Sequence, residues 1–496
     1  MTSDQETRVL NMLSAFEGGQ TIDTLPAGTG SVKDMKIEVL DDSTGASNYM
    51  NLREAVSVAN GGCCGRYWNN ANAAPKAAGN YGSLDMLRNL QNELSLGCYL
   101  VTDDRKRRKL DPVNHNRFED GSPAKLDGSM GQYMWCWDAH YETIWLEGTL
   151  EYWVVSREPI SGKRSYYIPA GGVSALGGGV LDRTNSILCS IINDSAQYRG
   201  GNNDASRDGT YRNQLGMVAT YLPYKNFSTY ARKRGQGWDA NWYVAQAVVN
   251  FMFAVIFGTR NWQEAYNANK DSNGLFQGGL GAGVTNMPDW GGFNGYYPIV
   301  PTSAGLELGD SCGVSIYNVL KEDGTVYYAA PVPVFFGLKN PFGHIWKIVS
   351  GEVVDAGAEI TSVYVAKSLY AGCDVTTTAG MIKAAELPRS EGWVKKVSMY
   401  LLNGLPTEVG GSPSTYYCDY FYTSAKTSQG LRARLVGASA TMVRMRVRFA
   451  RLCAARGRMR ILRFLRRSAI LKKMYKWKYS ENENEKIRRS LKLFHF

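Results

Sequence analysis

The stretch WDANWYVAQAVVNFMFAVIF, residues Trp238–Phe257, together with the Gly258 that follows it, sets the fold class of this chain. It predicts the clearest helix of the sequence, with Asp239 placed to cap its start and Gly258 to end it. Its core-facing stripe consists of Trp242, Val249, Phe253 and Ile256. The apolar run inside the stretch is interrupted by two amide side chains and is too short to span a bilayer, so we expect a helix inside a folded domain.

Strand patterns lie on both sides of this helix. Before it, Tyr133, Trp135 and Trp137 alternate, and Trp145–Val155 (WLEGTLEYWVV) continues with a period of two. After it, strands are predicted at Thr325–Leu338, Ile345–Val354, Ser362–Tyr370, Val397–Leu402 and Tyr416–Thr423. Residues 271–310 between them form a loop region rich in Gly, Asn and aromatic residues, and loops longer than about 15 residues are uncommon unless functional. One central helix, many strands and long loops predict an α+β domain.

Composition divides the chain into four segments. These are a small N-terminal attachment module at 1–58, a Gly/Asn-rich connecting region at 59–130, the main domain at 131–440 and a basic tail at 441–496. In the first segment, residues 5–16 have helical spacing and Met35–Leu40 alternates as a strand. In the second, Leu84–Leu96 is helix-like, and we expect the charged run DDRKRRK (Asp103–Lys109) to be a solvated turn.

The residues that usually carry catalysis or bind metals are sparse. The nine cysteines are scattered without a CxxC pair, which argues against a structural zinc site and a disulfide scaffold and favours free thiols in a reducing compartment. None of the four histidines has a helical spacing to another, and His344 is expected to pack in the core. The glycine-rich runs lack the Lys-Ser/Thr of a P-loop, and no GxSxG occurs. We therefore expect no enzyme, no cofactor and no metal.

The last 53 residues carry most of the charge. From Arg444 to Phe496 there are 18 Lys and Arg against three Glu, a net charge of +15, whereas residues 1–443 hold 38 basic and 42 acidic residues, a net of −4. The net charge of +11 for the whole chain therefore describes the tail. We expect nucleic acid to bind only nonspecifically, and only through this tail.

The segment Phe251–Tyr266 (FMFAVIFGTRNWQEAY) resembles the helix and following turn of C-type-lectin-like variable proteins of phage and prophage tails, the targets of diversity-generating retroelements. In that family an apolar helix ends in Gly-Thr-x-Asn, as at Gly258–Asn261. The aromatic and glycine-rich loop from Trp290 to Tyr297, the strand Val332–Leu338 and the approach Ser428–Gly437 also fit. The resemblance covers roughly residues 130–440, and the order of these motifs is more telling than any one of them.

The resemblance implies a fold and a function. The fold is a C-type-lectin-like ligand-binding domain at 131–440, and the function is receptor binding at the tip of a phage or prophage tail. The implied partners are a bacterial cell-surface receptor, protein or glycan, and other tail or baseplate proteins, with a homo-oligomer such as a trimer. The N-terminus, MTSDQE, lacks the basic and apolar regions of a signal peptide, so we expect synthesis in the host cytoplasm and a place in the virion tail.

Aromatic side chains are the candidate ligand contacts, because they provide contact area at low entropy cost. On the long loop these are Trp290, Phe293, Asn294, Tyr296 and Tyr297, and near the end of the domain Tyr416, Tyr417, Asp419, Tyr420 and Tyr422. A strand with a period of two would turn about half of the second group inward. Sugar binding through calcium is not supported, since Glu-Pro-Asn and Trp-Asn-Asp are absent and Glu158-Pro159 is followed by Ile160.

Two other classes of function stay open at this point. One is a structural tail or baseplate component with no receptor of its own. The other is an oxidase of the formylglycine-generating type, which shares the lectin-like architecture. That chemistry needs two closely spaced reactive cysteines, and the one adjacent pair, Cys63-Cys64, lies outside the lectin-like region.

The basic tail replaces the ending that the family implies, a motif like Gly-x-Ser-x-Asn-Asn-Gly-x-Asn-Ala-Gly. Here VGASA (436–440) is followed by TMVRMR (441–446). Met is encoded only by ATG, so Met442-Val443 forces GGT, glycine, in the frame that begins at the last base of each codon. Met445-Arg446 gives GCG, alanine, if the Arg codon is CGN. The shifted message can read GASANNGANAG. We therefore hypothesise a single-base deletion near codon 440, the rival being a genuine basic helix at Arg458–Lys478 that binds anionic membranes or nucleic acid.

The gene sequence tests the deletion hypothesis. We expect codons 438–465 to contain a continuous open frame shifted by one base, and we expect removal of residues 441–496 to leave the folding of the body little changed apart from the lost strand. A shifted frame interrupted by stop codons would end the hypothesis. A steep fall in the nucleic-acid affinity of the full chain with salt would favour the rival.

Overall fold

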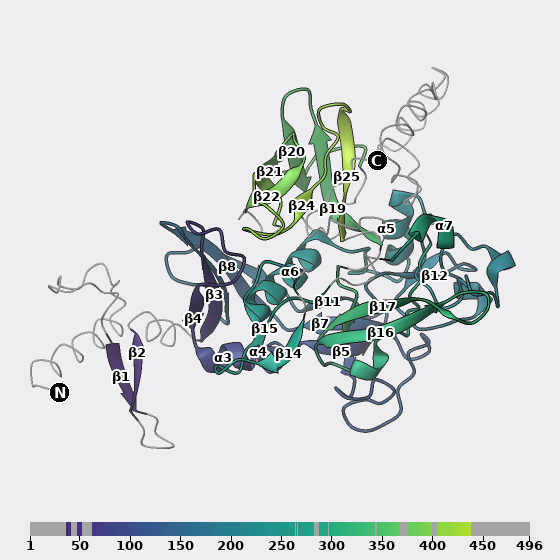
Figure 1. Ribbon diagram of the computed structural model, residues 1–496, viewed down its shortest axis with the longest axis horizontal. Coiled ribbons are helices and arrows are strands. Elements are labelled where there is room, and N and C mark those ends of the chain that lie inside the picture. The colour runs from purple at the N-terminus through teal and green to yellow at the C-terminus, as the bar shows by residue number, and fades with distance from the viewer. Residues whose placement is uncertain are drawn as a thin grey trace, which may run out of the picture.

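The computed structural model describes residues 36–40, 47–51, 62–262, 264, 266–281, 287–295, 297–342, 345–367, 375–398 and 404–437. Over these residues the chain is rich in strands and has few helices, which confirms the mixed α and β class predicted from the sequence (Figure 1). The strand predicted at Met35–Leu40 is present as β1 (Lys36–Leu40), paired with β2 (Ser47–Asn51). The helix predicted at residues 5–16 and the basic tail lie outside the described residues.

The described helices and sheets have the following bounds. The helices are α3 (Leu84–Arg88), α4 (Leu90–Glu93), α5 (Tyr224–Arg232), α6 (Tyr243–Phe257) and α7 (Trp290–Asn294). A five-stranded sheet has the order β10 (Ser165–Ile168), β8 (His140–Glu147), β9 (Leu150–Ser156), β3 (Cys63–Asn69) and β4 (Gly79–Gly82). One four-stranded sheet has the order β11 (Gly171–Ser174), β7 (Gln132–Trp137), β5 (Gly97–Val101) and β6 (Arg107–Lys109). A second four-stranded sheet has the order β21 (Ile382–Leu387), β20 (Thr361–Val365), β19 (Trp346–Ala356) and β25 (Gly430–Gly437). One three-stranded sheet has the order β16 (Gly313–Leu320), β17 (Val326–Phe335) and β18 (Leu338–Lys339), and another has the order β23 (Pro406–Val409), β22 (Gly392–Val397) and β24 (Tyr420–Phe421). Two further sheets are two-stranded: β12 (Val180–Asp182) pairs with β13 (Ile187–Cys189), and β14 (Asn267–Lys270) pairs with β15 (Phe276–Gln277).

Helix α6 is the centre of this arrangement (Figure 1). It contacts β9, β11, β15 and β19, and each of these strands belongs to a different sheet. Every residue of α6 except Val244 and Ala245 is buried, so the apolar surface extends well beyond the predicted stripe. A helix that is apolar on nearly all sides has to be enclosed, and four sheets enclose this one. None of the described helices has the length and apolar character needed to cross a membrane.

The two ends of α6 differ in how well the sequence predicts them. The end is as expected, because Gly258 adopts the left-handed conformation with φ 61°. There the buried guanidinium of Arg66, from β3, donates to the carbonyl oxygens of Val255 (2.9 Å) and Ile256 (3.2 Å) and places a positive charge at the helix C-terminus.

The start of α6 corrects the prediction. The helix begins at Tyr243, and Asp239 does not cap it. Asp239 instead accepts hydrogen bonds from Arg232 at the end of α5 (2.6 Å) and from the hydroxyl of Ser350 in β19 (2.9 Å). The Arg232 guanidinium, seven residues before Asp239, and the Ser350 hydroxyl, 111 residues after it, therefore bind the carboxylate that local spacing had assigned to the cap.

The turn after α6 carries a buried ion pair. Arg260 is fully buried and lies 3.0 Å from Glu151 Oε1 in β9. The same carboxylate accepts hydrogen bonds, each 2.8 Å long, from Asn70, Trp153 and Tyr417. We call these five residues the Arg260 clamp. Because the carboxylate has several donors and the guanidinium lies beside it, two charges can be buried together at a tolerable free-energy cost.

The Arg260 clamp joins segments that are far apart in sequence. The Arg260 guanidinium lies 4.6 Å from the ring centroids of both Trp68 and Tyr417. The backbone N–H of Arg260 donates to Pro75 O (2.8 Å), and the N–H of Tyr416 donates to Ala73 O (2.7 Å). The clamp thus holds the end of α6, the β3 region, β9 and the segment that begins at Tyr416 in one place.

The region predicted as a connector at 59–130 belongs to the core. Trp68, Leu87 and Leu100 are part of one buried hydrophobic cluster that also contains most of α6 and extends to Val436. Residue 130 is therefore not a boundary of the core. Within this region Arg107–Lys109 of the predicted solvated turn forms strand β6, whose charged side chains stay largely exposed and paired with Asp and Glu. No disulfide joins any of the seven cysteines that the structure describes.

One later strand prediction falls mostly outside the described residues. Of the range Val397–Leu402, Val397 is the last residue of β22 and Ser398 is not in a strand, while residues 399–403 lie outside the described part of the chain. The other predicted strands after α6, apart from Tyr416–Thr423, correspond to β17, β19 and β20.

Replacing Arg260 by Met tests the clamp, since it removes the charge and keeps most of the volume. We expect the free energy of unfolding to fall by about 3–5 kcal/mol, because Glu151 is left buried without its ionic partner. The matched control is Arg157→Met, which breaks an ion pair whose arginine side chain is 66% exposed, and which should cost no more than about 1 kcal/mol. Equal losses in denaturant titrations of the two variants would contradict the account.

Acidification tests the same site in another way. Burial raises the pKa of Glu151, but the charge of Arg260 and the hydrogen bonds from Asn70, Trp153 and Tyr417 outweigh burial and hold the pKa below its ordinary value of 4.5. The carboxylate therefore contributes stability that is present above pH 4.5 and is lost as the pH falls through its lowered pKa. We expect the difference in unfolding free energy between the wild type and Glu151→Gln to shrink on acidification, and a constant difference would argue against this assignment.

Candidate ligand-binding surface

The ten predicted contact residues fall into three groups. Four are buried: Phe293, Asn294, Tyr417 and Asp419. Four are partly exposed: Tyr297, Tyr416, Tyr420 and Tyr422. The side chain of Trp290 and the whole of Tyr296 lie outside the described residues. Burial of the first four argues against direct contact with a ligand, and the interactions of Phe293, Asn294 and Tyr417 give each of these three an internal role.

The loop around α7 is braced by polar side chains. Asp289, with φ 42°, caps α7 by accepting a hydrogen bond from Gly292 N–H (3.2 Å). The Asn294 side chain donates to the carbonyl oxygens of Tyr297 (2.8 Å) and Pro298 (2.9 Å). Asn294 therefore fixes the backbone that carries Tyr297, which is a supporting role rather than the predicted contact role.

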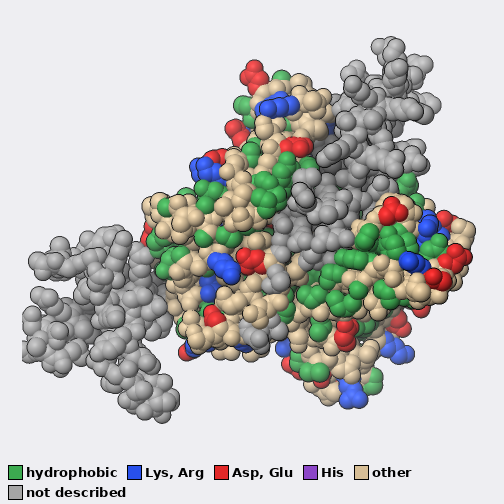
Figure 2. Space-filling model, in the orientation of Figure 1, with side chains coloured by type: hydrophobic (Ala, Val, Ile, Leu, Met, Phe, Trp, Pro, Cys, Tyr) green, Lys and Arg blue, Asp and Glu red, His purple; other side chains and the backbone are tan. Residues whose placement is uncertain are grey.

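Phe293 is likewise a packing residue. Its ring stacks on Tyr327 of β17 with the centroids 4.0 Å apart and the planes 5° apart. The guanidinium of Arg212 lies 5.4 Å from the Phe293 ring. This stack attaches α7 to the β16–β17 hairpin. Figure 2 shows hydrophobic side chains, tyrosine included, gathered on this face over β16 and β17 and next to α7.

The segment predicted as a strand at Tyr416–Thr423 is a turn followed by a two-residue strand. Tyr416 (φ 56°) and Cys418 (φ 53°) are left-handed, so the expected alternation of faces is broken. Tyr417 points inward to the Arg260 clamp through its hydroxyl. Only β24, with Tyr420 and Phe421, keeps strand geometry, paired with β22.

The two predicted groups of residues meet on one cluster. Tyr297 from the α7 loop and Tyr420 and Tyr422 from the β24 region pack against the same buried group, which consists of Tyr224, Trp346, Ile348, Ala433 and Leu435. Tyr221, which precedes α5, and Phe227, within α5, pack there too. We call the partly exposed tyrosines of this cluster, Tyr221, Tyr297, Tyr420 and Tyr422, the tyrosine face.

Ring contacts join the tyrosines of this face in two pairs. Tyr221 and Tyr297 have centroids 6.0 Å apart, and Tyr420 and Tyr422 have centroids 4.7 Å apart. Tyr420 also meets Trp393 edge to face at 5.4 Å. Ring pairs at these distances contribute about 0.5–1.5 kcal/mol beyond their buried area. The face is therefore preorganised, with rings that lose little freedom when a ligand binds.

An arginine lies at the edge of this face. The Arg207 guanidinium is 4.8 Å from the Tyr297 ring and donates to Asn294 Oδ1 (3.2 Å). Its position is also fixed by an ion pair with Asp204 (3.4 Å). Tyrosine and arginine together are the residue types that most often dominate the binding energy of protein interfaces.

The phenols of Tyr420 and Tyr422 stay protonated at neutral pH. Burial, followed by the negative charge of Glu391, raises the pKa of Tyr420. Burial and then the neighbouring Tyr420 and Glu391 raise the pKa of Tyr422. Each hydroxyl can therefore both donate and accept a hydrogen bond, which suits a protein or glycan ligand equally.

Three residues at this face were not predicted from the sequence: Tyr221, Phe227 and Arg207. The sequence signal for the first two is the three-residue spacing of aromatic residues at Tyr221, Tyr224 and Phe227. None of the residues of the tyrosine face belongs to the group of Cys, His and Asp side chains that could hold a metal ion among the described residues, Cys98, His115 and Asp310.

Comparison of the chain with protein-family models, curated proteins and solved structures gives no match.

Proposed function

We propose that this protein is a receptor-binding protein of a phage or prophage tail, and that the tyrosine face contacts the bacterial cell surface. The finer fold that accompanies this proposal is a C-type-lectin-like domain of the type diversified by retroelements. The sequence resemblance around Gly258–Asn261 supports it. The single structural observation that carries it is the convergence of Tyr297, Tyr420 and Tyr422, from two separate segments, on one partly exposed cluster.

The support beneath the face fits such a role. A binding site that tolerates changes in its side chains needs a backbone that is held from below. The Asn294 hydrogen bonds hold the Tyr297 side of the face, and the Tyr417 hydroxyl bonded to Glu151 holds the approach to Tyr420. Substitutions at the exposed rings can then alter binding while these buried contacts persist.

The proposed partners follow from the same reasoning. Partly exposed tyrosines with a neighbouring arginine fit a protein epitope or a glycan on a cell surface. Modest affinity at one site becomes strong attachment when several copies are displayed on one tail, which accords with a homo-oligomer. Other tail or baseplate proteins are the proposed attachment partners.

Cell-binding measurements with variants of the tyrosine face test the proposal. We expect Tyr297→Ser, Tyr420→Ser and Tyr422→Ser each to weaken binding of purified protein to intact candidate host cells by about tenfold, or about 1.4 kcal/mol. Tyr167→Ser is the matched control, because Tyr167 is 59% exposed on β10 of a different sheet, and it should leave binding unchanged. Thermal unfolding of each variant separates lost binding from lost folding.

The contrary outcomes are distinct. If the three variants of the tyrosine face bind cells as strongly as the control Tyr167→Ser does, the receptor contact lies elsewhere on the protein. Wild-type protein that binds no strain of a broad panel, yet assembles with baseplate proteins, would favour a structural tail component without a receptor of its own.

A further inference from the structure

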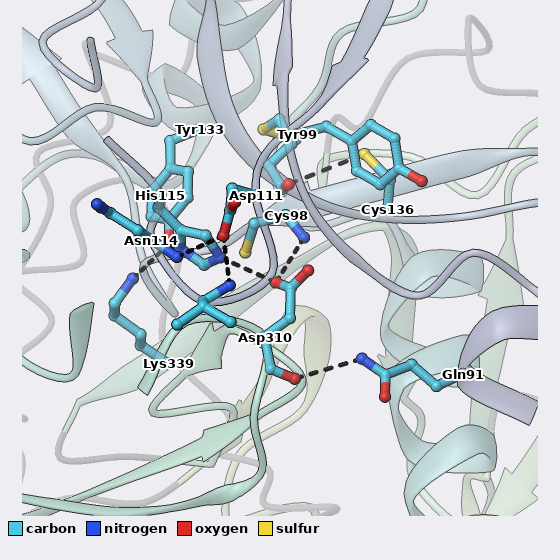
Figure 3. A network of polar contacts seen from close by, with 12 residues as sticks. Gln91, Cys98, Tyr99, Asp111, Asn114, His115, Tyr133, Cys136, Asp310 and Lys339 are labelled. Atoms are coloured by element: carbon cyan, nitrogen blue, oxygen red, sulfur yellow. Dashed lines mark hydrogen bonds and ion pairs between the residues drawn. The ribbon is translucent and has the colours of Figure 1, made fainter. Parts of the chain in front are cut away.

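A second group of polar side chains lies inside the molecule, away from the tyrosine face. Cys98, His115 and Asp310 each offer one ligand atom, and these atoms lie within 4.8 Å of one another (Figure 3). All three side chains are buried, with exposed fractions of 0%, 2% and 4%. Histidine spacing in the sequence gave no sign of such a group, because its members are brought together only by the fold.

Backbone contacts fix the three residues in place. Cys98 is in β5, and its N–H donates to Asp310 Oδ1 (2.9 Å). The Asp310 N–H donates to Pro112 O (2.8 Å), in the loop that leads to His115. Glycine 337 leaves room beside the group, since a Cβ there would lie 2.5 Å from Cys98 Sγ and 2.6 Å from Asp310 Oδ1. The group is therefore preorganised by three segments of the chain.

The donor set matches zinc. A thiolate, an imidazole and a carboxylate are the side chains that bind Zn²⁺ in proteins, with bonds of about 2.0–2.3 Å. Two ligands of a tetrahedral zinc are then about 3.3–3.8 Å apart, a spacing that atoms within 4.8 Å of one another reach with small movements.

The surroundings of His115 have the form of an outer shell. His115 Nδ1 lies 2.6 Å from the Tyr133 hydroxyl, and Lys339 Nζ donates to the same hydroxyl (2.8 Å). Metal-binding histidines usually use their second ring nitrogen for such a hydrogen bond, which fixes the tautomer and the ring orientation. With Nδ1–H donating to Tyr133, the lone pair of Nε2 faces Asp310 Oδ1 at 3.0 Å.

Asp310 provides the second, independent observation. Its Oδ2 atom is buried and has no hydrogen-bond partner among the described residues. A buried carboxylate oxygen without a partner carries a large desolvation cost, which a bound cation removes. Two arrangements fit the His115–Asp310 distance. Either Nε2–H donates to the carboxylate, or Nε2 and the carboxylate share a cation, and the second arrangement also provides a partner for Oδ2.

We propose that Cys98, His115 and Asp310 bind a structural Zn²⁺ ion, with the Asp310 carboxylate binding through both oxygens. The ion links β5, the loop at His115 and the loop at Asp310 into one unit. Binding releases the thiol proton of Cys98, so that the thiolate and the carboxylate together balance the two positive charges of the metal.

Metal analysis of the full-length protein tests the proposal. We expect about one equivalent of zinc per chain after purification without chelator, and a fall in the melting temperature by several degrees on chelation that added Zn²⁺ reverses. Cobalt replacement should give thiolate-to-cobalt charge-transfer absorption. Cys98→Ser and the isosteric Asp310→Asn should lose the metal, while Cys136→Ser, a change at another buried thiol on the adjacent strand β7, should retain it.

Three results would overturn the site. The first is wild-type protein that holds no zinc and gives no thiolate-to-cobalt absorption on titration with Co²⁺. The second is a melting temperature that chelation leaves unchanged. The third is full zinc content in Cys98→Ser, which would place the metal elsewhere. The cobalt titration of the wild type decides the matter even if a variant fails to fold.

Discussion

The contact between Arg260 and Glu151 is the interaction on which the remaining architecture rests. It lies directly after α6, and it joins the β3 region, β9 and the Tyr416 segment. Neither charge is acceptable in the core alone, because an isolated buried ion costs several kcal/mol. Each segment therefore stabilises the placement of the others, and the clamp forms as a unit.

The clamp and α6 together account for how a surface with exposed rings stays ordered. The helix contacts a strand from each of four sheets, so all four sheets pack against the same buried helix. The clamp then fixes the chain just before Tyr420, while Asn294 fixes the backbone at Tyr297 and Pro298. In the proposed function, the residues that stabilise the fold are therefore different from the residues that contact a receptor.

The sequence predicted what local patterns control. The apolar run and Gly258 predicted the position and end of α6. Period-two alternation predicted one strand over Trp145–Val155, and the structure divides this range into β8 and β9, an antiparallel pair with a turn at residues 148–149. The sequence did not predict contacts and turns that only the folded chain determines. Asp239 bonds to Arg232 and Ser350 rather than capping α6, and left-handed Tyr416 and Cys418 break a regular alternation. Cys98 and Asp310 are 212 positions apart, so their proximity had no local signal.

Hydrogen exchange at single amides tests the central claim most directly. The N–H groups of Arg260 and Tyr416 bond to Pro75 and Ala73, outside any regular helix or strand. If the clamp unites these segments, both amides exchange as slowly as those inside α6, through the same global opening. Fast exchange at Tyr416 beside a protected α6 would show that the segment opens on its own and would contradict the account.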